Sequence, residues 1–291
     1  MPLAAARTPA LPLRGVTLDL MDDLPAILAA ISAHRTVPTV RVVFDPARSP
    51  VDYAAAIRAL RPSAWIMGEL LDSTAMRGTT VAQVRARARR FTAALGGSVD
   101  IWEIGNEVNG AWVGRNPAEI NAKVAAAFDA VGGEAQARTA LTLNYWSGPG
   151  CYARPWEATL EFARAMPARV RAGVNFVFLS TYETACDPPQ HPTAQDMATM
   201  LASLGQIFPR ARLGIGEVGA QGIADGLPAD PTLAEKRRLA RRYYGMNAEL
   251  ARRVGPRFAG GWFWWYYRED AVPKDSPASL WPTLDGLLSA L

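Results

Sequence analysis

The nine residues Ile101-Trp102-Glu103-Ile104-Gly105-Asn106-Glu107-Val108-Asn109 join an apolar stretch directly to an adjacent amide and carboxylate. The apolar half has the composition of a strand buried in a sheet, and the polar half follows where such a strand ends. A carboxylate at that point is within reach of solvent and of a small molecule. The stretch therefore predicts a buried strand that carries chemically active side chains at its carboxyl end.

Strands and helices alternate along the chain on both sides of this stretch. Strands are predicted at residues 15–20, 39–44, 64–70, 101–109, 139–144, 174–180, 212–217 and 260–265. Helices are predicted at residues 24–33, 50–60, 79–95, from 117 onward, 155–166, 193–208, 231–254 and 279–291. Short strands alternating with helices favour a parallel sheet. Eight such units, with no change of composition between the two halves, predict a single (β/α)8 barrel over residues 14–291.

Residues 1–13 are predicted to form an unstructured leader, because they are rich in Ala and Pro. The leader lacks the apolar core of a signal peptide, although a signal removed from a longer chain would leave the same start. No run of eighteen apolar residues occurs in the sequence, so no transmembrane segment is expected. The first strand is not followed by the Gly-x-Gly-x-x-Gly turn of a dinucleotide-binding fold.

A net charge of +4 raises the question of a nucleic-acid or other polyanionic partner. The basic residues are densest within 85–90 and 236–242, where apolar residues recur between them at helical spacing. This interleaving favours the solvated faces of two helices. No nucleic-acid partner is expected, and a polyanion-binding surface stays open as the less favoured alternative.

A second glutamate follows a predicted strand in Leu213-Gly214-Ile215-Gly216-Glu217-Val218-Gly219, roughly a hundred residues after Glu107. The two stretches resemble clan A of the retaining glycoside hydrolases. In that clan the acid/base glutamate follows an asparagine at the end of the fourth strand, and the nucleophilic glutamate ends the seventh. The resemblance spans the predicted barrel, but only the strand ends are specific.

The resemblance implies that Glu107 protonates the leaving oxygen and then activates water, while Glu217 attacks the anomeric carbon. Asn106 would bind the sugar 2-hydroxyl. Strict strand alternation sends neighbouring residues to opposite faces, so the strand has to end or bend between Asn106 and Glu107. This chemistry requires no cofactor and no metal, and the two Cys and two His are scattered without zinc-site spacing.

Two further residues match positions of the clan. Arg41 lies within the predicted second strand, where a buried charge has to be paired. The resemblance places Arg41 near the nucleophile, and an ion pair with Glu103 is the alternative. Tyr182 matches a tyrosine that binds the nucleophile in the clan, and a core tyrosine is its alternative reading. The histidine that many relatives carry two residues earlier is Ser180 here, which weakens assignment to any one family.

Nine tryptophans indicate carbohydrate contacts, because sugars stack their apolar faces on aromatic rings. Trp264 and Trp265 share the prediction of a platform at the end of the eighth strand. The loops that follow the strands carry Trp112, Trp146, Trp156 and Trp281. Asn144, the last residue of the predicted fifth strand, is a further candidate substrate contact.

The two cysteines, Cys151 and Cys186, fall in the loops after the fifth and sixth strands. Neighbouring loops on one face of a barrel can bring two cysteines within disulfide range, and two free thiols remain the alternative. A disulfide implies an oxidising compartment, so a secreted or periplasmic location is expected and a cytoplasmic one stays open.

The sequence thus predicts a monomeric retaining β-glycoside hydrolase. The loops at 145–155 and 182–192 are long enough to shape a cleft, so an endo-acting enzyme on a polysaccharide is expected. A barrel of the same fold that binds carbohydrate without cleaving it is the alternative.

Overall fold

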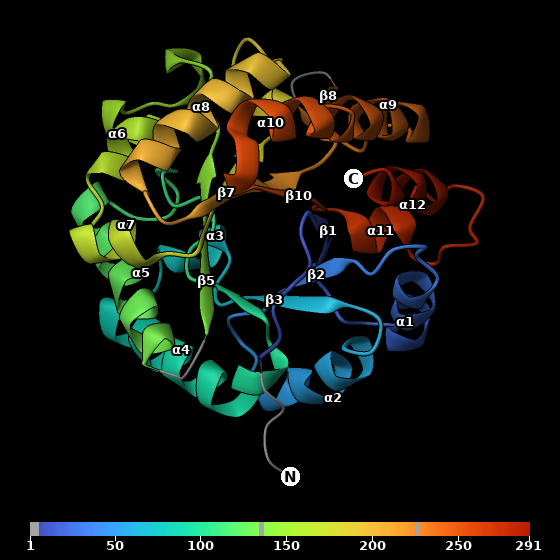
Figure 1. Ribbon diagram of the computed structural model, residues 1–291, viewed down its shortest axis with the longest axis horizontal. Helices are drawn as coiled ribbons and strands as arrows, with labels where there is room; N and C mark the ends of the chain where they lie inside the picture. The colour runs from blue at the N-terminus through green and yellow to red at the C-terminus, as the bar shows by residue number, and fades with distance from the viewer. Residues whose placement is uncertain (1–5, 134–136, 225–226) are drawn as a thin grey trace.

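Eight parallel strands close into a barrel in the computed structural model, which describes residues 6–133, 137–224 and 227–291. The strands are β1 (Leu13–Leu18), β2 (Thr39–Val43), β3 (Trp65–Glu69), β4 (Ile101–Glu103), β5 (Arg138–Asn144), β6 (Phe176–Thr181), β7 (Arg212–Val218) and β10 (Phe258–Trp264). Each strand pairs with its neighbours in sequence, and β10 closes the ring against β1. Helices surround this ring (Figure 1). The predicted (β/α)8 barrel is therefore confirmed.

The helices that connect the strands mostly begin and end within two residues of the predicted bounds. They are α1 (Leu24–Ser32), α2 (Val51–Leu60), α4 (Val81–Leu95), α5 (Pro117–Gly132), α6 (Thr159–Arg164), α7 (Ala168–Gly173), α8 (Ala194–Ile207), α9 (Leu233–Tyr244), α10 (Asn247–Val254) and α12 (Trp281–Ser289). Local capping explains several starts: the Thr80 hydroxyl accepts from the Gln83 amide at the start of α4, and the Asn116 side chain does the same for Glu119 at α5.

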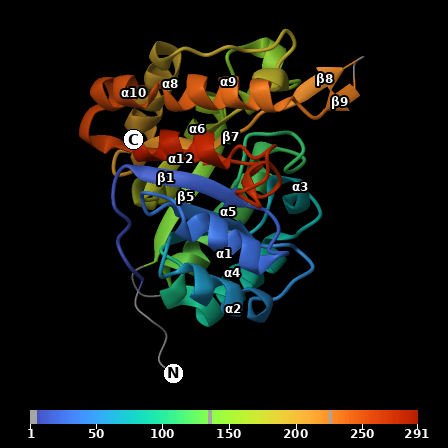
Figure 2. The same cartoon turned by 90° about the vertical axis from the view of Figure 1, so that its right-hand side faces the viewer.

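Some elements differ from the sequence-based expectation. The helix predicted over 231–254 is two helices, α9 and α10, separated at Gly245-Met246. The helix predicted over 155–166 is shorter, as α6, and the segment between it and β6 forms α7, which was not predicted. The short helices α3 (Ser73–Met76) and α11 (Tyr267–Ala271) were not predicted. Neither was a two-stranded hairpin of β8 (Gly222–Ala224) and β9 (Leu227–Ala229), which extends from the body beside α9 (Figure 2). The helices α3 and α11 and the hairpin lie after the carboxyl ends of strands, where they enlarge the loops of one barrel face.

The inside of the barrel has an apolar floor and a polar layer. The floor is a buried cluster of Leu13, Met67, Ile101, Ala140, Phe176, Phe178, Ala259 and Phe263. Gly15 makes room for it, because a Cβ there would lie 2.4 Å from the Phe263 ring. Glu69 and Glu103 lie two residues further along β3 and β4 than the floor residues Met67 and Ile101, so they face inward as well. Arg41 of β2, which pairs with Met67, contacts both carboxylates. The polar layer thus rests directly on the floor.

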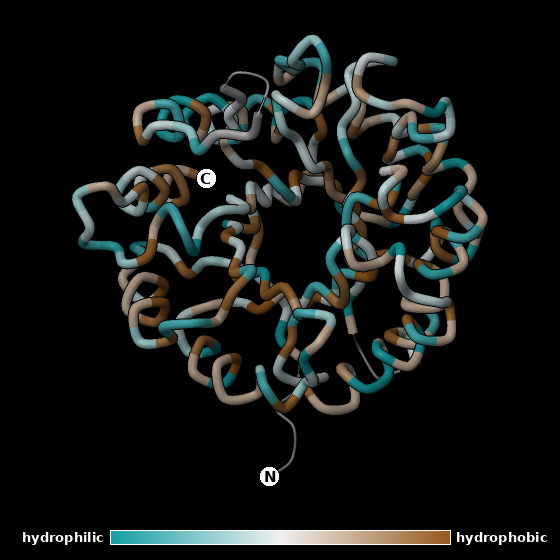
Figure 3. Tube along the Cα trace, turned by 180° about the vertical axis from the view of Figure 1, so that it is seen from behind, coloured by the Kyte–Doolittle hydropathy of each residue, from teal (hydrophilic) through white to brown (hydrophobic). Residues whose placement is uncertain are grey.

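Residues that alternate outward from the strands form a second core under the helices, including Val42, Trp102 and Leu143. Along the surrounding helices the chain alternates between hydrophobic and hydrophilic residues (Figure 3), as amphipathic helices require. Arg87 corrects the expectation of a fully solvated basic face on α4. It is buried and donates to the carbonyls of Leu70 and Phe44, so it joins α4 to the ends of β3 and β2.

The first five residues of the predicted leader lie outside the described residues. From there to β1 the chain forms no helix or strand. Arg7 nevertheless is anchored, because its guanidinium contacts the Asp100 carboxylate at 2.8 Å and donates to the Ala64 carbonyl at 2.7 Å. Within the described ranges, no helix is long and apolar enough to cross a membrane.

Candidate active site

Glu107 is presented by a tight turn rather than by a strand. Strand β4 ends at Glu103, and Glu107 itself has φ of 48°, in the left-handed region that few non-glycine residues adopt. Asn109 stabilises the turn: its Oδ1 accepts from the Asn144 amide at 2.7 Å and its Nδ2 donates to the Glu157 carbonyl at 2.9 Å. The strand therefore ends before Asn106, which satisfies the requirement drawn from strand alternation.

The carboxylate of Glu107 accepts a hydrogen bond from the Ser180 hydroxyl at 2.6 Å. Asn106 beside it is 1% exposed, and its Oδ1 has no protein partner in the described part of the chain. A buried amide oxygen without a donor is costly, so it is suited to a ligand hydroxyl. Asn106 and Glu107 thus both lie at the polar end of the barrel.

Glu217 reaches the barrel interior through a β-bulge. Leu179 of β6 pairs with Ile215 of β7, but the next residue, Ser180, pairs with Glu217, so Gly216 is one extra residue on β7. A Cβ on Gly216 would lie 2.6 Å from the Cβ of Phe178, so only glycine fits there. The bulge turns Glu217 inward although Ile215, two residues earlier, packs outward in the helix-facing core.

Two buried side chains hold the Glu217 carboxylate. The Tyr182 hydroxyl donates to Oε1 at 2.7 Å, and the Arg41 Nη1 donates to Oε2 at 2.7 Å. Arg41 is fully buried. Both side chains singled out by the resemblance therefore contact Glu217, and each fixes one oxygen of its carboxylate.

Arg41 also serves two other carboxylates. Its Nε lies 2.7 Å from Glu103 and 2.9 Å from Glu69, and the Thr142 hydroxyl donates to Glu103. Arg41 thus contacts both of its predicted partners, Glu217 and Glu103, at the same time. Sequence reasoning missed Glu69, although an acid at the end of an apolar strand was the signal used for the other two glutamates.

The electrostatics of the two candidate catalytic glutamates differ. Burial, followed by the negative charge of Glu217, raises the pKa of Glu107 to about 8, and the Ser180 hydrogen bond opposes that rise. Burial also raises the pKa of Glu217, but there the Arg41 guanidinium and the Tyr182 hydroxyl both favour the ionised form. These surroundings favour the proton on Glu107 over Glu217.

Glu69 is a third buried acid in the site. Burial raises the pKa of Glu69 well above its ordinary value, with Arg41 acting against the rise. Neither of its oxygens accepts a hydrogen bond in the described residues. Burial therefore favours the protonated form of Glu69, whereas the contact with Arg41 favours the ionised form.

The tryptophan at the end of β10 that faces the site is Trp265. It is partly exposed, and the centroid of its ring lies 5.2 Å from Cζ of Arg41. Trp264 points the other way: it is fully buried and donates to Asp270 at 2.8 Å. Neighbouring residues of a strand face opposite sides. The platform prediction, which Trp264 and Trp265 shared, is therefore corrected to Trp265 alone.

The other tryptophans predicted to contact substrate differ in what they pack against. Trp112 is 36% exposed and packs edge-to-face on Trp146, with ring centroids 6.2 Å apart. Trp156 packs on Phe162 and Trp281 stacks on His34, so both serve packing between helices instead of the site. Asn144 has a clear structural contact. Its side chain is buried and donates to the Glu107 carbonyl at 3.2 Å, so it supports the Glu107 turn.

Cys151 and Cys186 form a disulfide that joins the loops after β5 and β6. Gln190 supports the same junction, since its amide donates to the carbonyls of Tyr145 and Tyr182. These loops border the site from the side of Ser180. In the described ranges, no three His, Cys, Asp or Glu side chains group in a way that could hold a metal ion.

Comparison with known proteins gives matches only at the level of structure. No protein-family profile and no curated protein sequence matches the chain. The mannanase catalytic domain from Streptomyces sp. SirexAA-E superposes with a TM-score of 0.63 at 18% identity, over 99% of this chain and 93% of that one. This chain shares its fold.

Other hydrolases superpose in the same way. The β-mannanase of Thermomonospora fusca, solved with mannotriose, has a TM-score of 0.59 at 18% identity, over 88% of this chain and 78% of its own. A family 1 β-glucosidase from Thermotoga maritima has a TM-score of 0.57 at 11% identity, over 84% and 76%. At such identities the likeness establishes the barrel fold, and the chemistry has to be argued from the site.

Proposed function

We propose that this chain is a retaining β-glycoside hydrolase of the clan A type, with Glu107 as acid/base and Glu217 as nucleophile. The observation that carries the proposal is the contrast between the two carboxylates. Glu217 is held by two donors, Arg41 and Tyr182, whereas Glu107 receives a single donor among the described residues, the Ser180 hydroxyl. Retaining hydrolysis needs this pair of an ionised and a protonated acid.

In the first step an oxygen of Glu217 attacks the anomeric carbon, and the bond from that carbon to the leaving oxygen breaks. The leaving oxygen takes the proton of Glu107 and departs as an alcohol. The products are a glycosyl ester on Glu217 and an ionised Glu107. Asn106, with its unpartnered buried oxygen, is placed beside Glu107 to bind a sugar hydroxyl.

The second step follows from the change of charge. Forming the ester removes the negative charge of Glu217, and with it one cause of the raised pKa of Glu107. Glu107 then holds its proton less tightly, but it still accepts one from water. The water oxygen attacks the anomeric carbon, the ester bond breaks, and the sugar leaves with its original configuration.

For the substrate we infer a β-linked polysaccharide cleaved within the chain. Trp265 lies at the end of β10, whereas the Trp112 and Trp146 pair lies on loops after β4 and β5. Aromatic rings on separate loops suit more than one sugar ring. Since two structural neighbours are mannanases, β-1,4-mannan is the first substrate to test. The Cys151–Cys186 bridge supports action outside the cytoplasm. We propose in addition that the chain acts as a monomer.

The deciding experiment follows a polysaccharide panel and 4-nitrophenyl β-glycosides by proton NMR during the first turnovers. The proposal expects the β-anomer as the first product and oligosaccharides from the polymer. An α-anomer as first product would overturn the mechanism, and monosaccharide alone would overturn endo action. Binding of oligosaccharide without turnover by the native chain would instead support the non-catalytic barrel.

A further inference from the structure

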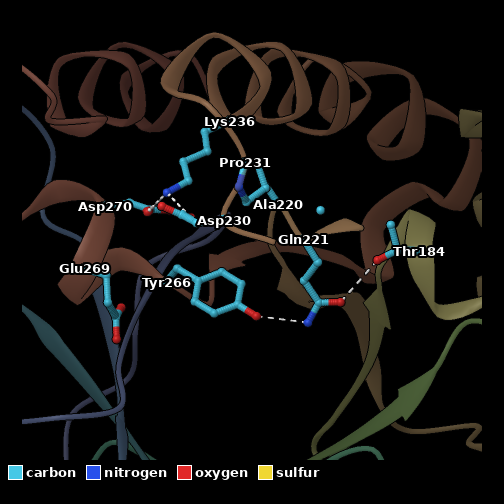
Figure 4. A pocket seen from close by; sticks show the side chains of 10 residues that line it. Thr184, Ala220, Gln221, Asp230, Pro231, Lys236, Tyr266, Glu269 and Asp270 are labelled. Carbon is cyan, nitrogen blue, oxygen red and sulfur yellow. Dashed lines mark hydrogen bonds and ion pairs between the residues drawn. The ribbon is translucent and has the colours of Figure 1, made fainter. Parts of the chain in front are cut away.

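A cavity of about 690 Å³ opens at the carboxyl ends of β7 and β10, beneath the N-terminal part of α9 (Figure 4). Its volume lies within the range of pockets that bind small molecules. The polar side chains that line it are Thr184, Gln221, Asp230, Lys236, Tyr266, Glu269 and Asp270. None of them belongs to the catalytic arrangement described above.

The cavity lies next to the catalytic centre on the side of Tyr266. A Cβ on Gly219 would lie 2.9 Å from the Tyr182 ring and 3.1 Å from the Tyr266 ring, so both rings pack against the same backbone. Tyr182 in turn donates to Glu217. Tyr266, which lines the cavity, therefore lies close to Tyr182, the side chain that binds Glu217.

The wall nearest the catalytic centre has groups that suit a sugar ring. The Tyr266 ring is partly exposed, and its hydroxyl accepts from the Gln221 amide at 2.9 Å. The Thr184 hydroxyl donates to the other end of that amide at 3.3 Å. An aromatic face beside a chain of exposed donors and acceptors can stack on a sugar and exchange hydrogen bonds with its hydroxyls.

The opposite wall is mainly acidic. The Lys236 ammonium lies 2.7 Å from Asp230 and 2.8 Å from Asp270, and one ammonium therefore faces two carboxylates. Glu269 adds a third carboxyl group, which lines the cavity. Burial and the neighbouring Asp19 raise the pKa of Glu269 to about 7. The cavity thus keeps a net negative charge near neutral pH, which disfavours an anionic occupant.

We propose that this cavity is a further sugar subsite, which accepts a ring without negative charge and discriminates against a uronic acid. The proposal rests on the proposed function, because it assigns the cavity to the same substrate chain. Tyr266 supplies the stacking face, Gln221 and Thr184 supply hydrogen bonds, and the carboxylates of Asp230 and Glu269 repel a charged ring.

The first test compares a substrate that is too short to fill the cavity with one that is long enough. For 4-nitrophenyl β-mannoside and β-1,4-mannopentaose, Tyr266→Ala and Gln221→Ala should each lower kcat/KM for the pentasaccharide about tenfold more than for the aryl glycoside, mainly through KM. Gln206→Ala, an exposed glutamine of α8, is the matched control and should change neither value. Equal losses on both substrates would overturn the subsite.

Calorimetry separates failure of the subsite from failure of the proposed function. In the Glu217→Gln background, which is expected to bind without turnover, adding Tyr266→Ala should weaken mannopentaose about tenfold. If the native chain shows no turnover but this loss of affinity appears, the proposed function fails and the subsite stands. If Tyr266→Ala leaves the affinity unchanged, or if mannopentaose does not bind, the subsite is wrong.

The charge argument has its own test. The Glu217→Gln variant, with an unaltered cavity, should bind mannopentaose at least tenfold more tightly than a β-1,4-mannuronate pentasaccharide. Glu269→Gln should reduce that ratio several-fold, whereas Glu161→Gln, an exposed acid of α6, should leave it unchanged. A ratio insensitive to Glu269→Gln, at low and high salt alike, would overturn the acidic discrimination.

Discussion

Ser180 pairs with Glu217 across β6 and β7, and the Ser180 hydroxyl binds the carboxylate of Glu107. Ser180 therefore contacts both candidate catalytic acids. Its backbone pairs with Glu217, and its side chain binds Glu107. The bulge at Gly216 creates this pairing, so a local irregularity of β7 sets the position of Glu217 relative to Glu107.

This relationship predicts the pH dependence of activity. With the pKa of Glu107 at about 8, kcat/KM should fall as the pH rises through that value, because the free enzyme loses its acid. The Ser180 hydroxyl favours the ionised form of Glu107, so Ser180→Ala should move the basic limb to higher pH. Ser203→Ala, on α8, is the control. An unmoved or lowered limb in the Ser180 variant would contradict the assignment of Glu107 as the acid.

Glu69 predicts a change in the pH dependence of stability. Burial raises the pKa of Glu69 above its value in the unfolded chain. Between those two pKa values the folded chain keeps a proton on Glu69 that the unfolded chain has lost. The free energy of unfolding therefore falls as the pH rises from the unfolded pKa through the folded one. Glu69→Gln should remove up to about 1.4 kcal/mol per pH unit of that slope.

Urea unfolding of Glu69→Gln and of the native chain between pH 5 and 8 measures this slope. Glu161→Gln serves as the exposed control. A larger loss of stability in the Glu69 variant at pH 8 than at pH 5 would show that Glu69 is ionised in the folded chain.

The two tryptophans at the end of β10 should respond differently to truncation. Trp265→Ala removes a partly exposed ring beside Arg41 and should raise KM several-fold while the unfolding free energy changes little. Trp264→Ala leaves a cavity and removes the donor to Asp270, so it should cost about 3–5 kcal/mol of stability. Denaturation and initial-rate measurements on both variants check this. A stability loss confined to the Trp265 variant would reverse the assignment.

The Cys151–Cys186 bridge closes a loop with a sequence separation of 35. In the chain-entropy view it should stabilise the folded state by about 3–4 kcal/mol. Mass spectrometry of non-reduced peptides should recover the linked pair from protein made in an oxidising compartment. Unfolding of the Cys151→Ser, Cys186→Ser double variant should show the loss. Two free thiols in the native protein would refute the bridge.

Much of the barrel could be read from the sequence because strands buried on both faces are continuous apolar runs, and their β-branched residues separate them from the helices. The ends of the strands were less predictable. Residues 104–109 continue the apolar pattern of β4, yet they form a turn that Asn109 fixes through contacts with Asn144 and Glu157. Such contacts come from residues far apart in the sequence.

The same limit applies to the site. Glu217 and Arg41 were found because a charged residue in or after an apolar strand is conspicuous. The bulge at Gly216 was not found, because glycine is compatible with a regular strand as well as with a bulge. Trp264 and Trp265 could not be separated without knowing the parity of β10, and the cavity beside Tyr266 depends on loops whose course no local pattern fixes.

The final prediction divides the chemistry between the two glutamates. Glu217→Gln replaces the attacking carboxylate with a neutral amide, so turnover of every substrate should stop while oligosaccharide binding persists. Glu107→Ala removes acid assistance, so substrates with poor leaving groups should lose a factor of about 10² to 10⁴ in rate. An activated aryl glycoside needs little protonation, and Glu217 should still attack it in the Glu107 variant.

Azide distinguishes these roles from a general loss of structure. In the Glu107→Ala variant no base activates water, so the glycosyl ester on Glu217 is hydrolysed slowly. Azide is a nucleophile that needs no deprotonation, so added azide should raise the rate and give a β-glycosyl azide. The Glu217→Gln variant forms no ester and should give no β-azide. Glu161→Gln should behave as the native chain. If azide restored nothing to the Glu107 variant, and both glutamate variants lost activity equally on good and poor leaving groups, Glu107 would not be the acid/base and the division of roles would have to be abandoned.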